Sequence, residues 1–167
     1  MDLLVVGRVP SRSHARFWLA MTGLLVYLAV VLLATLSPTP LDQGYESSIE
    51  QLLDVLHSHG VPEWYGYNKL EFSANVAMFV PVGFLLALAL PRRGIWLVVI
   101  VIPAFSATIE LLQAAFLAER FASVLDVVAN TAGGYLGAVA AIGMRAAIAT
   151  RDQRVIARAA REAQHCP

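Results

Sequence analysis

Long apolar runs alternate with short polar segments along this chain, and their lengths predict helices that cross a membrane. A helix needs about 20 apolar residues to span the hydrocarbon core of a bilayer. The segments that approach or exceed this length are Phe17 to Leu36, Ser73 to Leu90, Ile95 to Leu117 and Val124 to Met144. We therefore predict an all-α fold, an integral membrane bundle of four transmembrane helices. This transmembrane domain covers residues 17–149, between an N-terminal segment 1–16 and a basic tail 150–167.

Two of the predicted helices contain a proline, Pro81 in the second and Pro103 in the third. Proline has no N–H group, so the carbonyl four residues earlier loses its helical partner. Neighbouring helices or water usually satisfy such a carbonyl inside a membrane. We expect kinks rather than breaks, and both helices should pack inside the bundle.

Basic residues are segregated to one side of the predicted membrane. Ten of the twelve Lys and Arg residues lie there: Arg8, Arg12, Arg16, Arg92, Arg93, Arg145, Arg151, Arg154, Arg158 and Arg161. The positive-inside rule then places both termini in the cytoplasm. The arginines of the tail could also hold anionic headgroups, although their role in topology explains them equally well. The first apolar run is longer than the 7–15 residues typical of a signal peptide, so we expect a retained anchor.

The long loop 37–72 falls on the extracytoplasmic side. Ile49, Leu52 and Leu56 recur there at helical spacing, which predicts a short amphipathic helix resting on the outer membrane surface. His57 and His59 follow it. Two histidines do not make a metal site, and we expect them to be solvated loop residues.

Composition supports a membrane protein and excludes several other classes. The chain is 58% hydrophobic and only 14% charged, against about 45–50% and 25% in soluble domains. The lone Cys166 cannot form an internal disulfide and is expected to be incidental. The sequence contains no Gly-rich phosphate loop, nucleophile elbow or His-Glu-x-x-His helix, so no cofactor or metal is expected. The basic tail has no interleaved aromatic residues, which gives no support for nucleic-acid binding.

Glu110 and Asp126 are carboxylates inside predicted membrane helices, where an ionisable side chain is by default a functional-site hypothesis. Glu110 lies about 12 Å below the outer end of its helix at 1.5 Å per residue. Helical spacing gives each carboxylate polar neighbours, and the second helix adds Asn75. The predicted ligand-binding residues are Asn75, Glu110, Gln113, Arg120, Asp126 and Asn130.

These residues favour a polar pocket that opens to the extracytoplasmic side, because buried charges must pair or reach water. Arg120, in the turn above, could neutralise a carboxylate or bind an anionic group of a ligand. The alternative is that the polar groups only hold the helices together. Gly83 lies on the second predicted helix, and Gly133 and Gly137 lie on the fourth. Gly133-x-x-x-Gly137 is a close-packing motif that needs no ligand.

A series of sequence blocks stands between about Leu70 and Ala138. They are Asn75-Val-Ala-Met-Phe-Val-Pro-Val-Gly83-Phe-Leu-Leu86, Ile109-Glu110-Leu-Leu-Gln113, Arg120, Asp126, Asn130-Thr131, Gly133 and Gly137. Their order and spacing resemble the VanZ-like family of bacterial membrane proteins. The resemblance implies a small multi-pass protein of the bacterial cytoplasmic membrane, related to an accessory protein of glycopeptide (teicoplanin) resistance. Many relatives carry a second aspartate three residues after the loop arginine, where this chain has Ser123.

Three functions remain open. The first, which we favour, is a non-enzymatic envelope protein that contacts membrane lipids and binds a lipid-linked cell-wall intermediate or a glycopeptide in an outward-facing pocket. The second is a membrane-embedded hydrolase or transferase with Glu110 or Asp126 as general base. The third is a transporter, which would have to be a homo-oligomer because four helices are few for an alternating-access pathway.

Overall fold

The computed structural model describes residues 14–36, 46–117 and 123–164, and within these ranges the chain is mostly helical with no strand. Four of the helices are long and apolar enough to cross a membrane, which confirms the predicted all-α fold of four transmembrane helices. In chain order the elements are α1 (His14–Thr35), α2 (Glu46–Ser58), α3 (Tyr67–Ala89), the 3-10 helix η1 (Arg92–Leu97), α4 (Val98–Phe116) and α5 (Val124–Gln164).

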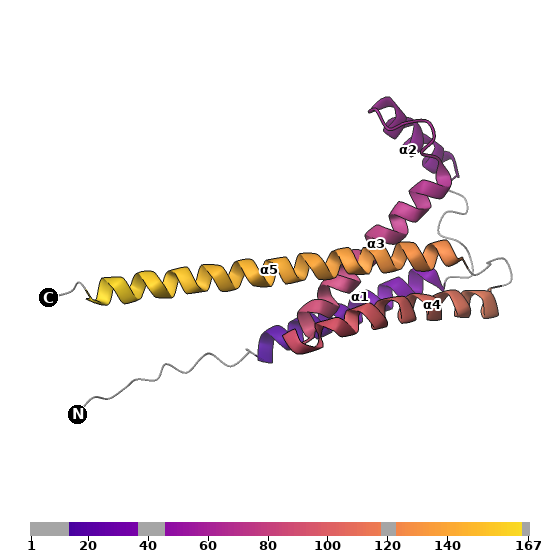
Figure 1. Cartoon of the computed structure of the whole chain (residues 1–167). Coiled ribbons are helices and arrows are strands. Elements are labelled where there is room, and N and C mark those ends of the chain that lie inside the picture. The colour runs from indigo at the N-terminus through magenta and orange to yellow at the C-terminus, as the bar shows by residue number, and fades with distance from the viewer. Residues whose placement is uncertain (1–13, 37–45, 118–122, 165–167) are drawn as a thin grey trace.

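Helix α3 is central to the bundle, because it packs closely against α5 and also contacts α1 and α4 (Figure 1). Helix α5 packs against α4 as well and continues far beyond the other helices toward the C-terminus. Its 41 residues span about 62 Å, roughly twice the thickness of the hydrocarbon core. The last part of α5 therefore extends outside any membrane that the bundle crosses.

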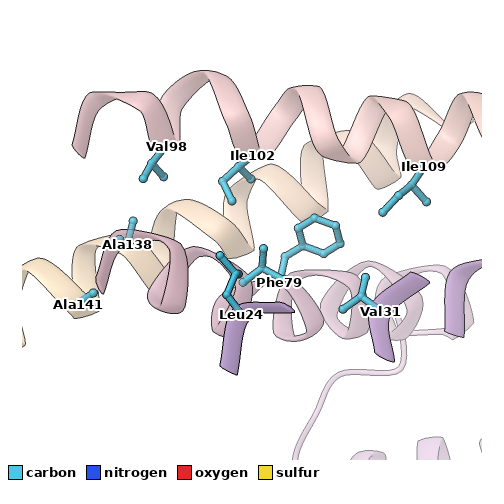
Figure 2. Close-up of a cluster of buried hydrophobic side chains, with 10 residues drawn as sticks. Leu24, Val31, Phe79, Val98, Ile102, Ile109, Ala138 and Ala141 are labelled. Atoms are coloured by element: carbon cyan, nitrogen blue, oxygen red, sulfur yellow. The ribbon is translucent and has the colours of Figure 1, made fainter. Parts of the chain in front are cut away.

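The buried core lies where the four long helices meet (Figure 2). Leu24 and Val31 come from α1, Phe79 comes from α3, and Ile102 and Ile109 come from α4. The rings of Phe79 and Phe105 stand 6.1 Å apart, centroid to centroid. Many large apolar side chains of the four long helices are exposed, among them Leu33, Val99, Leu111 and Val139, as expected of helices whose solvent is lipid.

Glycines allow α3 and α5 to approach until their backbones touch. A Cβ atom at Gly83 would lie 1.8 Å from the carbonyl oxygen of Gly134, and one at Gly137 would lie 1.9 Å from that of Val80. At Gly133 the corresponding distance to the Val76 carbonyl oxygen is 2.0 Å. Small residues permit this kind of close contact between membrane helices. The α3–α5 contact therefore leaves no room for a side chain at these three positions.

Helix α4 continues through Pro103 because a neighbouring helix replaces the missing hydrogen bond. Pro103 leaves the carbonyl of Val99 without its helical donor. The Tyr135 hydroxyl of α5 donates to this oxygen at 2.9 Å. A second tyrosine, Tyr27 of α1, donates to the Met78 carbonyl of α3 at 3.0 Å. Both hydroxyls thus join helices through backbone acceptors inside the apolar region.

Helix α2 stands apart from the bundle beyond the start of α3 (Figure 1). Its Leu52 and Val55 side chains are exposed, and its position on the outer membrane surface stays a prediction. The Nε2 atom of His57 donates to the Tyr65 carbonyl at 3.1 Å, and the Tyr65 hydroxyl donates to Ser73 Oγ at 2.7 Å. These two bonds connect the end of α2 to the first turns of α3.

Candidate functional site

The end of the bundle that holds Glu110 and Asp126, called the polar end below, collects polar side chains from three helices. Glu110 lies in the second half of α4 and is only 6% exposed. Its Oε2 atom accepts a hydrogen bond from the backbone N–H of Ser123 at 2.8 Å. Ser123 immediately precedes α5, whose first N–H groups have no partners within the helix and form the positive end of its dipole. The Glu110 carboxyl group therefore stabilises the start of α5.

Ser123 also uses its side chain at this point. Its Oγ atom accepts a hydrogen bond from the backbone N–H of Asp126 at 3.3 Å, which is the usual contact of a serine at the N-cap of a helix. The Oδ1 atom of Asp126 in turn accepts a hydrogen bond from Asn75 Nδ2 of α3 at 2.9 Å. Glu110, Ser123, Asp126 and Asn75 thus form one connected group that joins α4, α5 and α3.

One helical turn deeper, Asn130 of α5 faces Ser106 of α4. Asn130 is 3% exposed, and its Nδ2 atom donates to Ser106 Oγ at 3.0 Å. Among the described residues, Asn130 Oδ1 and the nearby Thr131 Oγ1 are buried without any hydrogen-bond partner. Buried polar atoms are almost always paired, with protein or with water. These two oxygens are therefore unsatisfied within the described part of the chain.

Gln113 connects the same end of α4 to α1. The Gln113 side chain is buried, and its Nε2 atom donates to the backbone carbonyl of Thr35 at 2.8 Å. Thr35 is the last residue of α1, where carbonyl groups have no partner within the helix. Gln113 therefore satisfies a helix end and holds α1 against α4.

Five of the six predicted ligand-binding residues lie within the described chain, and all five are at the polar end. They fall into three hydrogen-bonded groups: Asn75–Asp126–Ser123–Glu110, Ser106–Asn130 and Gln113–Thr35. The sixth, Arg120, lies outside the described residues, so its predicted contacts with the carboxylates stay a prediction. We call the seven side chains of these groups the polar cluster: Asn75, Ser106, Glu110, Gln113, Ser123, Asp126 and Asn130.

Three members of these groups, Ser106, Ser123 and Thr35, were not among the predicted site residues. Ser123 was noted only because it replaces an aspartate found in relatives, yet it is the residue that joins Glu110 to Asp126. A serine directly before an apolar helical run is a common N-cap signal, so the sequence contained a clue. Thr35 takes part through its backbone carbonyl, which no side-chain pattern indicates.

The loop histidines behave differently from the polar cluster. His59, directly after α2, contacts the Val55 carbonyl through Nδ1 at 2.8 Å, and His57 in the last turn of α2 contacts the Tyr65 carbonyl. No group of three or more His, Cys, Asp or Glu residues able to hold a metal ion occurs in the described part of the chain. Both imidazoles are therefore engaged with backbone oxygens.

Acceptor oxygens dominate the polar cluster. The two carboxyl groups, three amides and two serine hydroxyls each supply them. Asn130 Oδ1 in the cluster and Thr131 Oγ1 next to it in sequence lack a partner among the described residues. Carboxylates and amide oxygens accept hydrogen bonds from hydroxyl, amide or ammonium groups. The arrangement is therefore suited to a group that donates hydrogen bonds.

Four long apolar helices, joined by buried polar contacts and close glycine packing, define a multi-pass helical membrane protein. The VanZ/LLP1 family matches residues 22–146, a region that contains all of α3 and α4, parts of α1 and α5, and the whole polar cluster. The chain belongs to the VanZ-like family, as its sequence blocks predicted. Comparison with curated proteins and with solved structures gave no significant match.

Proposed function

We propose that this VanZ-type membrane protein binds an amphiphilic, lipid-linked ligand of the bacterial envelope at its polar cluster, without catalysing a reaction. The observation that carries the proposal is the pair of buried oxygens, Asn130 Oδ1 and Thr131 Oγ1, without partners among the described residues. An unpaired buried acceptor is unfavourable by about 1–3 kcal/mol. A ligand that donates hydrogen bonds, directly or through water, would recover that free energy.

The chemistry of the cluster narrows the class of ligand. Acceptor oxygens favour hydroxyl and amide donors, which are abundant on the sugars and peptides of lipid-linked cell-wall intermediates and of glycopeptides. Helices α4 and α5 also expose large apolar side chains near the cluster. These are Leu111 and Phe116 on α4, and Val124 and Leu125 on α5. A lipid chain could lie against this surface while its head group reaches the polar cluster.

Membership of the VanZ-like family supports a role at the envelope, and the family's namesake supports a connection to glycopeptide resistance. The predicted orientation, with both termini in the cytoplasm, places the polar end at the outer leaflet of the cytoplasmic membrane. Envelope intermediates are exposed to the cell exterior at that leaflet. The orientation, the membrane and the ligand are thus parts of one proposal. Substitutions in the polar cluster can test it.

Binding can be measured with the full-length protein in lipid nanodiscs by its thermal stabilisation. The ligands are a lipid-linked cell-wall intermediate and teicoplanin, each titrated separately. Glu110→Gln keeps an acceptor oxygen for the Ser123 N–H and removes only the negative charge. We expect it to weaken binding about tenfold, the size of one charge-assisted hydrogen bond. Arg120→Ala should weaken it similarly if Arg120 contacts an anionic group of the ligand.

Two control variants separate binding from stability. Glu63→Gln removes one negative charge from an exposed loop position and should leave binding unchanged. Ser123→Ala weakens the start of α5 but leaves the Glu110 carboxyl group intact, so it should lower the melting temperature more than the affinity. If neither ligand stabilises the wild-type protein, the binding proposal is wrong. If the purified protein converted the lipid-linked intermediate into another compound, the protein would be an enzyme rather than a binding protein.

A further inference from the structure

A separate cavity of about 250 Å³ lies at the opposite end of the bundle, called the basic end below. The residues that line it come from η1 and from the middle of α5: Arg92, Ile95, Ile142, Arg145 and Ala146. Two of them are arginines and none is a carboxylate. The cavity therefore combines positive charge with an apolar wall.

Arg145 is held in place by the end of α3. Its guanidinium group donates to the Leu90 carbonyl from both terminal nitrogens, each at 3.2 Å, and to the Leu88 carbonyl. Carbonyl groups at the end of a helix lack partners within it and form the negative end of its dipole. Arg145 thus joins α5 to the end of α3, and the planar guanidinium is fixed beside the cavity. A fixed guanidinium loses less conformational entropy when it binds a phosphate.

The cavity lies at the level where the apolar spans end. The span of α3 ends at Ala89, and the next span begins at Arg92. Trp96 of η1 is 58% exposed, and tryptophan is enriched at the boundary between lipid and water. Along α5, Arg145 lies about 28 Å from Asp126 at 1.5 Å per residue. This distance is close to the 30 Å of hydrocarbon in a bilayer, so the polar and basic ends lie near opposite membrane surfaces.

The apolar wall of the cavity faces outward. Ile142 is 45% exposed on α5, and Ile95 of η1 is half-buried. A phosphate placed between the two arginines would have its attached acyl chains directed along these isoleucines into the bilayer. A soluble phosphate would use the arginines but would leave the apolar wall uncovered. Two arginines beside an exposed apolar wall therefore favour a phospholipid over a soluble phosphate.

We propose that Arg92 and Arg145 bind the phosphate of an anionic phospholipid, whose acyl chains contact Ile95 and Ile142. The cavity is smaller than the roughly 300–1,000 Å³ of pockets that enclose a whole drug-sized ligand. It suits a head group whose tails remain in the membrane. This lipid site shares no residue with the polar cluster, and it holds whether or not the proposed function does.

The test uses the full-length protein and native mass spectrometry after titration with phosphatidylglycerol, with phosphatidylcholine as the zwitterionic comparison. Wild-type protein should retain phosphatidylglycerol more tightly than phosphatidylcholine. Arg92→Gln should weaken phosphatidylglycerol binding about fivefold, the size expected for one basic residue at an anionic membrane surface. Arg158→Gln removes the same charge from an exposed position on the far part of α5 and should leave the affinity unchanged.

Arg92 is exposed, so its substitution should not disturb folding. Arg145→Lys is the second variant, because it keeps the charge but loses the planar fork, and it should also weaken the lipid. Equal losses in Arg92→Gln and Arg158→Gln would overturn the site and indicate attraction to net charge alone. Equal binding of the two lipids would overturn it as well. Displacement of phosphatidylglycerol by millimolar inorganic phosphate would show that the site takes soluble phosphate instead.

Discussion

Replacement of Gly137 by alanine should separate α3 from α5 and destabilise the protein. The added Cβ atom would lie 1.9 Å from the Val80 carbonyl oxygen and 2.7 Å from the Phe84 backbone nitrogen. Carbon–oxygen contacts at helix interfaces are about 3.3 Å or longer, so the helices must move apart by roughly 1.4 Å. A radial gap of about 1 Å already loses up to about half of the dispersion energy of a contact.

The obstruction at Gly137 is backbone, which cannot rotate away, so we expect a loss near the top of the usual overpacking range, about 3 kcal/mol. That loss corresponds to a fall in melting temperature of about 6–12 °C for a chain of this size. The measurement is thermal unfolding of the purified protein, followed by tryptophan fluorescence in one detergent.

Gly143 provides a matched control on the same helix. Apart from the adjacent residues and the nearby backbone of α5 itself, no heavy atom lies within 4 Å of the position that a Cβ atom would take there. Gly143→Ala should therefore leave the melting temperature unchanged or raise it, since alanine favours a helix by up to about 1 kcal/mol over glycine. Equal changes in the Gly137 and Gly143 variants would refute the close-packing explanation.

Three further predictions concern polar contacts and orientation. A double-mutant cycle with Ser106→Ala and Asn130→Ala should give a coupling of about 0.6 kcal/mol, the average for hydrogen bonds between membrane helices; zero coupling would show that the bond does not stabilise the bundle. Tyr135→Phe removes the donor to the Val99 carbonyl and should destabilise by about 1 kcal/mol, whereas unchanged stability would mean that another donor reaches that oxygen. Cys166 is the sole cysteine, so a membrane-impermeant maleimide should label it only after cells are lysed; labelling of intact cells would reverse the predicted orientation.

The arrangement of membrane helices could be predicted because the bilayer imposes a simple requirement on length and polarity. Each span needs about 20 apolar residues, and the runs around α1, α3, α4 and α5 meet that requirement. The spacing of polar residues was also informative. Asn75 and Asp126 lie 51 positions apart in sequence, yet their side chains meet at 2.9 Å.

Several partners of individual polar groups could not be predicted, because they are backbone atoms. The structure shows Glu110 bonded to the N–H of Ser123, a contact that no side-chain pattern indicates. Gln113 likewise meets the carbonyl of Thr35. Every residue carries these backbone groups, so sequence patterns do not reveal which of them remain unpaired at a helix end. Only the packing of the helices determines that.

The proposed function is tested most directly by locating the bound ligand. A lipid-linked cell-wall intermediate that carries a photoreactive group on its head group can be cross-linked to the full-length protein, and the modified peptides can be identified by mass spectrometry. The proposal predicts adducts on α4 and α5 near Ser106–Gln113 and Ser123–Thr131, reduced by excess unlabelled intermediate and weakened in Glu110→Gln. Adducts confined to the basic end around Arg92 and Arg145, or adducts that excess intermediate does not reduce, would contradict it.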